Sequence, residues 1–191
     1  KDLVGIPWRV AFALQDDGWY LRSDIIWSKP NPMPESVTDR PTRAHEYIFL
    51  LTKAERYYYD AHAIRELSTE RSSKNHDRKA NHQPNGRSHY QTSIPYSPDG
   101  TGRNKRSVWE ITTQPYPEAH FATFPEALVE PCILAGCPNG GTVLDPFAGS
   151  GTTLVVAQKL GRKAVGTDIN PEYLKLAAAR VTAVTLPMQL V

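Results

Sequence analysis

The sequence predicts an α/β fold built around a parallel sheet, and three observations lead to that prediction. Strand-like apolar runs alternate with helix-like segments along the chain. A glycine-rich turn joins the strand-like run 142–145 to a helix-like segment, as in α/β folds that bind nucleosides. The composition is globular, with 40% hydrophobic and 22% charged residues, and 191 residues are enough to bury a core.

The composition also excludes several classes of protein. About 18 consecutive apolar residues would be needed to span a membrane, and no such run occurs. The first residues, Lys-Asp-Leu-Val, lack the basic and apolar regions of a signal peptide. Cys132 and Cys137 form neither a disulfide framework nor a metal-binding pattern. We therefore expect a cytoplasmic protein with no metal and no membrane contact.

The first 60 residues are expected to form one helix and three strands. Residues 3–15 carry apolar side chains at helical spacing, and an Asp-Asp-Gly sequence ends this helix. A strand is predicted over 20–28, before a proline-rich stretch that cannot be regular. The apolar run 46–52 is typical of a strand buried on both faces. Residues 55–60, which end just after three tyrosines, are expected to add a short strand.

The last third of the chain is expected to alternate between strands and helices. Asn170 and Pro171 begin the final helix as its cap and first residue. The other predicted elements are an extended segment at 107–111, helices at 125–135 and 152–160, and strands at 142–145 and 163–168. Because the glycine turn comes late, the nucleoside-binding half is expected to be last in the chain. The sheet is therefore expected to be incomplete in these residues.

Between these parts lies a polar and basic segment, residues 66–107. It carries 8 basic and 4 acidic side chains and only five hydrophobic ones in 42 residues. Such a segment cannot build its own core, so one interpretation is a solvated, flexible insertion. The other is a loop that becomes ordered on nucleic acid, with Arg103, Lys105 and Arg106 neutralising phosphates.

The strongest motif is the sequence from Asp145 to Thr153, which follows a strand and opens a helix. Gly149 and Gly151 allow a tight turn and a close approach to a ligand. Asp168 ends the next strand, 23 residues after Asp145, where such folds place an acid on ribose hydroxyls. Leu154 stands where a full dinucleotide motif needs a small residue, which argues against a nicotinamide dehydrogenase. A tight turn in an unrelated α/β domain remains the alternative.

The chain resembles the permuted, β-type DNA amino-methyltransferases, which modify cytosine N4 or adenine N6, in its motifs DPFAGSGTT and GTDINPEY. In the same order as that family, it resembles the catalytic half in residues 3–36 and 40–53. Residues 120–138 resemble the cofactor helix that precedes the glycine turn. The resemblance leaves out residues 66–107, where the family has its variable target-recognition segment.

This resemblance implies a Rossmann-like methyltransferase sheet with S-adenosylmethionine as cofactor and double-stranded DNA as partner. The implied cofactor-binding residues are Asp145, Phe147, Gly149, Ser150, Gly151, Thr152, Asp168, Ile169, His120, Thr123 and Pro125. Asp168 is expected to hold the ribose and Ile169 to pack on the adenine. Residues 120–125, His-Phe-Ala-Thr-Phe-Pro, depart from the family's His-x-Thr-Gln-Lys-Pro pattern. The departure favours cytosine N4 over adenine N6.

The resemblance also implies contacts with DNA. The residues expected to border the pocket for a flipped base are Trp27, Lys29, Asn31 and Pro32. The candidates for DNA contact are Arg40, Arg43, Arg103, Lys105 and Arg106. A proline-rich loop with one packed tryptophan, and a solvated loop around the first two arginines, are the structural alternatives.

The family's catalytic tetrapeptide, Asp/Asn/Ser-Pro-Pro followed by an aromatic residue, does not occur in these 191 residues. It is expected upstream of Lys1, so we interpret the chain as a C-terminal portion that is inactive alone. The missing N-terminal part is then an expected partner. The alternative is a cofactor- and DNA-binding remnant or subunit without turnover. A restriction-modification system in a bacterial or phage-infected cytoplasm is the expected setting.

Three regions are expected along the chain. Residues 1–65 belong to the catalytic half of the methyltransferase domain. Residues 66–107 form the target-recognition insertion. Residues 108–191 form the half that binds S-adenosylmethionine.

Overall fold

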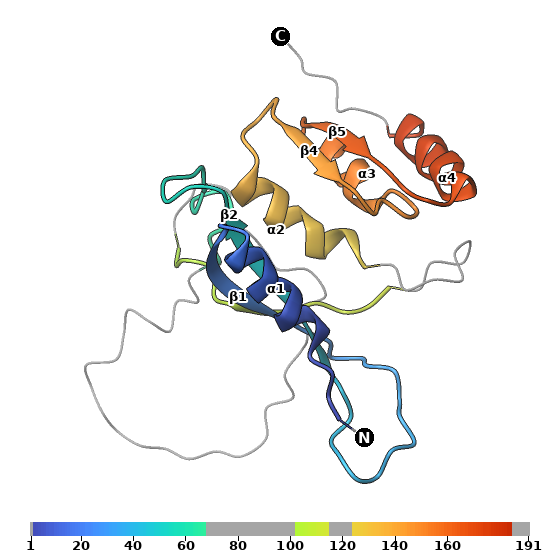
Figure 1. The fold of residues 1–191 in the computed structure, drawn as a ribbon. Helices are drawn as coiled ribbons and strands as arrows, with labels where there is room; N and C mark the ends of the chain where they lie inside the picture. Colours follow the sequence, from blue (N-terminus) through green and yellow to red (C-terminus); the bar gives the residue numbers. More distant parts are fainter. Residues whose placement is uncertain (1, 68–101, 115–123, 185–191) are drawn as a thin grey trace, which may run out of the picture.

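The computed structural model describes residues 2–67, 102–114 and 124–184. Within these ranges the strands form a three-stranded sheet, in the order β2-β1-β3, and a two-stranded sheet of β4 and β5. Helix α2 lies between the two sheets (Figure 1). The combination of strands and helices confirms the predicted α/β class.

The N-terminal part consists of a helix and an antiparallel strand pair. Helix α1 (Ile6–Asp16) is followed by β1 (Tyr20–Ser28) and β2 (His45–Thr52). The pairing of β1 with β2 is antiparallel, from Tyr20 opposite Thr52 to Ser28 opposite His45. The predicted parallel pairing does not hold for β1 and β2, because no helix separates these strands and the chain returns directly to pair alongside β1.

The third strand of this sheet comes from beyond the basic segment. Strand β3 (Val108–Glu110) pairs in parallel with the end of β1, where Trp109 lies opposite Trp27. The two tryptophans are buried together with Ile111 and Leu128 in one hydrophobic cluster. Residues predicted to begin the C-terminal half thus complete the N-terminal sheet.

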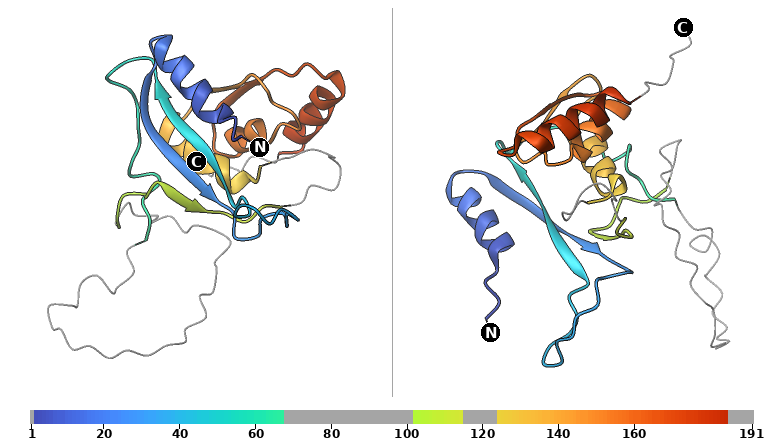
Figure 2. Two further views of the ribbon diagram at one scale, coloured as in Figure 1. Left: turned by 60° about the horizontal axis from the view of Figure 1, so that its bottom comes forward. Right: turned by 90° about the vertical axis from the view of Figure 1, so that its right-hand side faces the viewer.

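Helices cover both faces of this sheet, as the two views of Figure 2 show. On one face, the Trp8 ring of α1 packs edge-on against Tyr47 and Phe49 of β2, with centroids 5.5 and 4.9 Å apart. The opposite face of the sheet looks toward α2. Grooves lined by residues of both β2 and α2 lie between them. Strand β2 is nevertheless an edge strand of this sheet, and Thr52 is its one buried residue, so the expectation of a strand buried on both faces is not met.

The segment after β2 is irregular, so the strand predicted at 55–60 is wrong. The backbone N–H of Asp60 donates to the carbonyl of Ala135 in α2, 2.9 Å away, and not to a strand. The Tyr57 hydroxyl accepts a bond from Arg22 at 3.3 Å. The carboxylate of Asp60 also accepts bonds from the next backbone groups, at His62 and Ala63. Such local side-chain bonds favour a turn over a ladder.

The C-terminal part follows the predicted alternation of strands and helices. Its elements are α2 (Glu126–Gly136), β4 (Thr142–Asp145), α3 (Thr152–Lys159), β5 (Lys163–Gly166) and α4 (Pro171–Thr182). Strands β4 and β5 are parallel, with α3 as the crossover. The apolar face of α3 packs against α2 through Val129, Ile133, Val156 and Ala157. In the described residues, no helix has the length and apolar character needed to span a membrane.

Candidate functional site

The carboxyl ends of β4 and β5 lie side by side, as the glycine motif predicts. Asp145 is opposite Gly166 in the ladder, and the N–H of Thr167 donates to the carbonyl of Asp145 at 3.0 Å. The glycine turn after β4 also bonds to the segment after β5: the N–H of Ala148 donates to the carbonyl of Thr167 at 2.8 Å. The two turns that leave the strands are therefore bonded to each other.

Asp168 links the same two turns through its side chain. One carboxylate oxygen accepts the N–H of Gly149 at 2.8 Å, and the other accepts the N–H of Asn170 at 2.8 Å. The side chain is half-buried. Each carboxylate oxygen can accept about two hydrogen bonds, so this geometry leaves acceptor capacity on both oxygens. The carboxylate can thus hold the turns together and still accept hydroxyl donors.

Two large apolar side chains project beside this acid. Phe147 is 87% exposed and Ile169 is 101% exposed, one on each of the two turns. The position of Phe147 is set by its own N–H, which donates to Asp145 at 3.0 Å. Exposed apolar side chains that flank a polar group are typical of a ligand-binding surface.

The predicted contacts of Ser150 and Thr152 are not at the surface. These residues are 8% and 6% exposed, and their hydroxyl groups lie within hydrogen-bond distance of Arg180 on α4. Ligand contacts by this part of the turn would therefore come from the backbone. Thr152 begins α3, whose first N–H groups have no partner within the helix and favour a negatively charged group.

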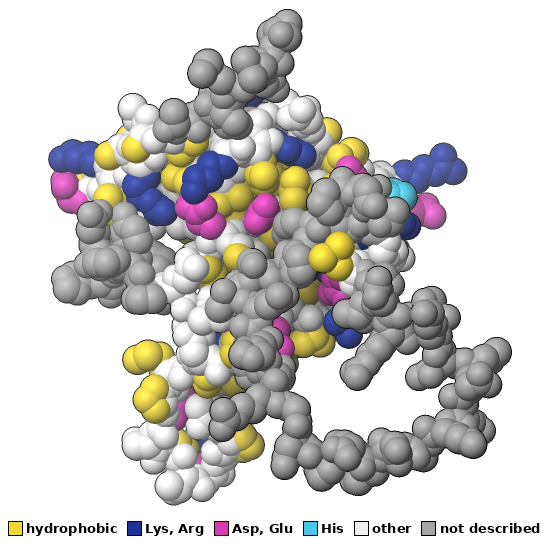
Figure 3. All heavy atoms as spheres, turned by 180° about the vertical axis from the view of Figure 1, so that it is seen from behind, with side chains coloured by type: hydrophobic (Ala, Val, Ile, Leu, Met, Phe, Trp, Pro, Cys, Tyr) yellow, Lys and Arg dark blue, Asp and Glu magenta, His cyan; other side chains and the backbone are white. Residues whose placement is uncertain are grey.

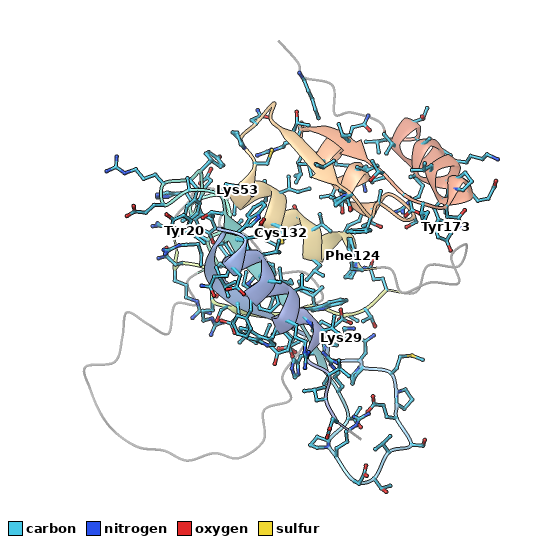
Figure 4. The ribbon with its side chains drawn as sticks, viewed as in Figure 1. Tyr20, Lys29, Lys53, Phe124, Cys132 and Tyr173 are labelled. Atoms are coloured by element: carbon cyan, nitrogen blue, oxygen red, sulfur yellow. The ribbon has the colours of Figure 1, made fainter. Side chains whose placement is uncertain are left out.

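A groove of about 730 Å³ separates the N-terminal sheet from α2 and β4. Trp27 and Ile48 lie on one wall, and Phe124, Cys132 and Thr153 on the other. Figure 4 shows Cys132 on α2 and Phe124 just before that helix begins, beside the β1–β2 sheet. The groove thus runs from the predicted base pocket to the start of α3.

The residues predicted to border the base pocket gather at the end of β1. Trp27 is buried, and its ring N–H donates to the carbonyl of Ile111 at 2.8 Å. The Lys29 ammonium lies 4.3 Å from the centre of the Trp27 ring and forms an ion pair with Glu46. Trp27 is therefore both a core residue and part of the groove wall.

Asn31 and Pro32 continue from this strand end. The Asn31 amide donates to the carbonyl of Thr113 at 3.3 Å and accepts the Thr113 N–H at 3.0 Å. These two bonds extend the pairing of β1 with the segment after β3. Pro32 is half-buried next to them.

The predicted DNA contacts at the base of the basic segment are held by one acid. Arg103 and Arg106 donate to the same Glu66 oxygen at 2.9 and 3.1 Å. Burial alone would raise the pKa of Glu66, but the bonds from these arginines hold it below its usual value. Lys105 lies 4.9 Å from the centre of the Trp109 ring, and burial lowers its pKa.

The other two predicted DNA contacts lie in the loop before β2. Arg40 donates to Glu35 at 2.7 Å, and this bond holds the pKa of Glu35 below its usual value. The Arg43 side chain donates to the carbonyl of His45 at 3.4 Å. The face seen in Figure 3 carries basic and acidic side chains next to each other, so charge alone does not mark a DNA-binding surface there.

Of the three remaining residues predicted to bind the cofactor, the structure describes one. His120 and Thr123 lie outside the described residues. Pro125 is buried and begins α2 as its cap residue. Among the residues the structure describes, no group of three or more His, Cys, Asp or Glu side chains could hold a metal ion.

Sequence reasoning missed two residues that organise the site. Glu66, the buried partner of Arg103 and Arg106, was hidden in a segment that appeared uniformly polar in sequence. Arg180, which contacts the glycine turn, lies 30 residues after Ser150. No spacing rule relates either residue to its partners, so neither carries a signal in the sequence.

Solved methyltransferases share this fold. The structure matches the complex of M1.HpyAVI with S-adenosylmethionine at a TM-score of 0.63 and 21% identity, over 94% of this chain and 71% of that one. It matches the cytosine-N4-specific PvuII DNA methyltransferase at a TM-score of 0.64 and 21% identity, over 94% and 60%. The predicted Rossmann-like methyltransferase fold is confirmed.

A sequence model of the DNA methylase family matches residues 2–179, and the chain belongs to that family. It is 51% identical over 181 residues to the type II methyltransferase M.SmaI of Serratia marcescens, covering 95% of this chain and 53% of that protein. It is 52% identical to M.Cfr9I of Citrobacter freundii, covering 95% and 51%. The chain spans about half the length of these curated relatives.

Proposed function

We propose that this chain binds S-adenosylmethionine and contributes to methylation of an exocyclic amine on a flipped DNA base, within a restriction-modification system. The observation that carries the proposal is the Asp168 carboxylate bonded to Gly149 at the joined ends of two parallel strands. Membership of the DNA methylase family supports the same reading. So do the relatives named type II methyltransferases.

The described residues fit this cofactor. Asp168 retains acceptor capacity for ribose hydroxyls, and the exposed Phe147 and Ile169 can enclose a flat base between apolar surfaces. Asp145, Gly149, Ser150 and Gly151 shape the turn, and the first N–H groups of α3 at Thr152 suit a carboxylate. His120, Thr123 and Pro125 complete the proposed set. When bound, the cofactor would supply an activated methyl group.

The protein's task in this reaction is to hold two reactants in line. An amine on a base is a poor nucleophile, so a fixed orientation of base and donor supplies much of the rate. The groove between Trp27 and Thr153 connects the proposed base pocket with the start of α3. Its walls are largely apolar side chains, which exclude water from a base placed there. Trp27, Lys29, Asn31 and Pro32 would border that base.

The proposed target is cytosine N4, with adenine N6 as the alternative. The departure of residues 120–125 from the family's usual pattern favours cytosine. A structural neighbour is a cytosine-N4-specific enzyme, although that likeness concerns the fold.

Double-stranded DNA is the proposed partner. A base must leave the duplex to reach such a pocket. Arg40, Arg43, Arg103, Lys105 and Arg106 are the proposed phosphate contacts. Several of them are tied to acids in this structure, so they would have to exchange partners on binding. In this proposal residues 1–65 and 108–191 supply the base and cofactor sites, and 66–107 reads the target.

We further propose that these 191 residues bind the cofactor without turnover, because no Pro-Pro-aromatic tetrapeptide occurs among them. In this proposal the residues are a working part of an active methyltransferase. The competing proposal is a remnant or subunit that binds cofactor and DNA but takes no part in turnover. A longer protein that carries these residues together with the tetrapeptide distinguishes the two. Mass analysis of nucleosides from DNA treated with it should show N4-methylcytosine, while unmodified DNA would favour the remnant.

Calorimetric titration of the 191-residue chain tests the cofactor site. S-Adenosylmethionine should bind at one site per chain, and S-adenosylhomocysteine should compete with it, whereas NAD should give no heat of binding. Binding of NAD and not of S-adenosylmethionine would contradict the proposal. Incubation with duplex DNA and radiolabelled donor should leave the DNA unlabelled, and measured transfer would contradict the proposed lack of turnover.

A further inference from the structure

Arg180 of α4 reaches the glycine turn from a distant part of the chain. Its Nη1 donates to the carbonyl of Ser150 at 2.6 Å and lies 3.0 Å from the Ser150 hydroxyl and 3.4 Å from the Thr152 hydroxyl. Both acceptor residues are buried. Bonds from a charged donor to buried acceptors are stronger than those between neutral groups. One nitrogen of this guanidinium thus contacts three oxygens, two at Ser150 in the turn and one at Thr152, where α3 begins.

The same helix contacts the turn at a second point, one helical turn away from Arg180. Gly151 has φ +81°, and a Cβ built on it would lie 2.7 Å from the Cβ of Ala177. Ala177 is buried. Residues three apart lie on the same face of a helix. The same face of α4 therefore packs against the glycine turn through Ala177 and donates hydrogen bonds to it through Arg180.

These contacts fix the orientation of one peptide group. The carbonyl of Ser150 is bound by Arg180, and the N–H of the following Gly151 donates to Ala148 at 2.8 Å. Both polar groups of this peptide are therefore satisfied, and rotating it would cost both bonds. The neighbouring N–H of Gly149 is held by Asp168. The turn is bound on one side by the acid and on the other by Arg180.

We propose that Arg180 is a positioning residue for the methyl donor, acting by holding the glycine turn in its binding shape. This inference rests on the proposed function, because the turn is the proposed cofactor site. Arg180 acts through the Ser150 carbonyl and does not need to touch the donor. Loss of its side chain leaves that buried carbonyl without this donor, and the turn then samples shapes that the donor does not fit.

The test compares R180M and R180K with K175M in the 191-residue chain. Lys175 lies on the same helix, is exposed, and pairs with Glu172. By calorimetry, R180M should weaken S-adenosylmethionine binding about tenfold or more, as expected for loss of a charged hydrogen bond to a buried acceptor. R180K, which keeps the charge but has no fork of donors, should fall between R180M and wild type. K175M should bind like wild type.

Hydrogen exchange separates positioning from general stability. Without ligand, R180M should exchange faster at amides of residues 149–153, while β5 and α3 beyond its first turn keep wild-type protection. Wild-type affinity in R180M would overturn the inference, as would faster exchange spread evenly over α3, α4 and β5. If R180M does not fold, R180K serves as the test. Wild-type affinity and wild-type hydrogen exchange in R180K would also overturn the inference. Failure of the wild type to bind S-adenosylmethionine would refute the proposed function instead.

Discussion

The carboxylate of Asp168 accepts the backbone N–H of Gly149 at 2.8 Å, across 19 residues of sequence. This bond joins the turn after β4 to the turn after β5. The second oxygen of Asp168 accepts the N–H of Asn170, which fixes the carboxylate from both sides. Asp168 thus both fixes the glycine turn by a hydrogen bond and is the proposed hydrogen-bond acceptor for ribose hydroxyls.

The double role of Asp168 predicts a large effect of a small change. In D168N an amide NH₂ replaces one oxygen, so it must face one of the two backbone donors, Gly149 or Asn170; that hydrogen bond is lost together with the acceptor capacity of the replaced oxygen. Affinity for S-adenosylmethionine should fall about tenfold or more. Calorimetry measures this, with D24N, at an exposed position of β1, as the control that should bind like wild type. Wild-type affinity in D168N would contradict the assignment of Asp168 to the cofactor site.

Gly151 is predicted to be intolerant of any side chain. In G151A the added Cβ meets Ala177 at 2.7 Å, and φ +81° strains a residue that has a Cβ. The free energy of unfolding should fall by about 1–3 kcal/mol, the usual cost of such backbone strain. Urea denaturation measures it. G136A is the control, since nothing lies within 4 Å of a Cβ there. Equal stability of the two variants would contradict the packing of α4 on the turn.

Glu66 is predicted to make stability depend on pH. Because the bonds from Arg103 and Arg106 lower its pKa below 4.5, its contribution is fully present above that value and is lost as pH falls through the lower folded-state pKa. At pH 7, E66Q should be less stable than wild type by about 1.5–3 kcal/mol. The difference should shrink below pH 4.5. Urea denaturation across pH tests this, with E110Q on β3 as control. A difference that stays constant in acid would refute the prediction.

Cys132 is predicted to react slowly although it lines a groove. Cys132 is solvent-exposed at the groove, but desolvation of its thiol by the surrounding groove walls raises the pKa to about 11, so little thiolate exists at neutral pH. In C137S, where Cys132 is the remaining cysteine, alkylation by iodoacetamide near pH 8 should be about tenfold slower than for a cysteine peptide. The rate should keep rising with pH up to about 10. A rate that levels off near the ordinary thiol pKa would show that Cys132 is freely solvated.

Local chemistry determined the elements that the sequence predicts well. The helices α1, α2, α3 and α4 and the parallel pair β4–β5 follow from apolar periodicity, caps and glycine positions, which are properties of neighbouring residues. For the same reason the pairing of the Asp145 turn with Asp168 was predictable. Two parallel strands joined by one helix bring their carboxyl ends to one edge of a sheet.

Tertiary structure alone decided the features that depend on distant partners. The segment with Tyr57, Tyr58 and Tyr59 has strand composition, yet Asp60 bonds to α2 and no strand forms. Arg103 and Arg106 look like free cations in the sequence, but Glu66 binds both. Arg180 resembles any arginine near a helix end, yet it holds the glycine turn. Such bonds join residues about 30 to 75 positions apart, and their partners are chosen by how the elements pack, a choice that no local pattern of residues encodes.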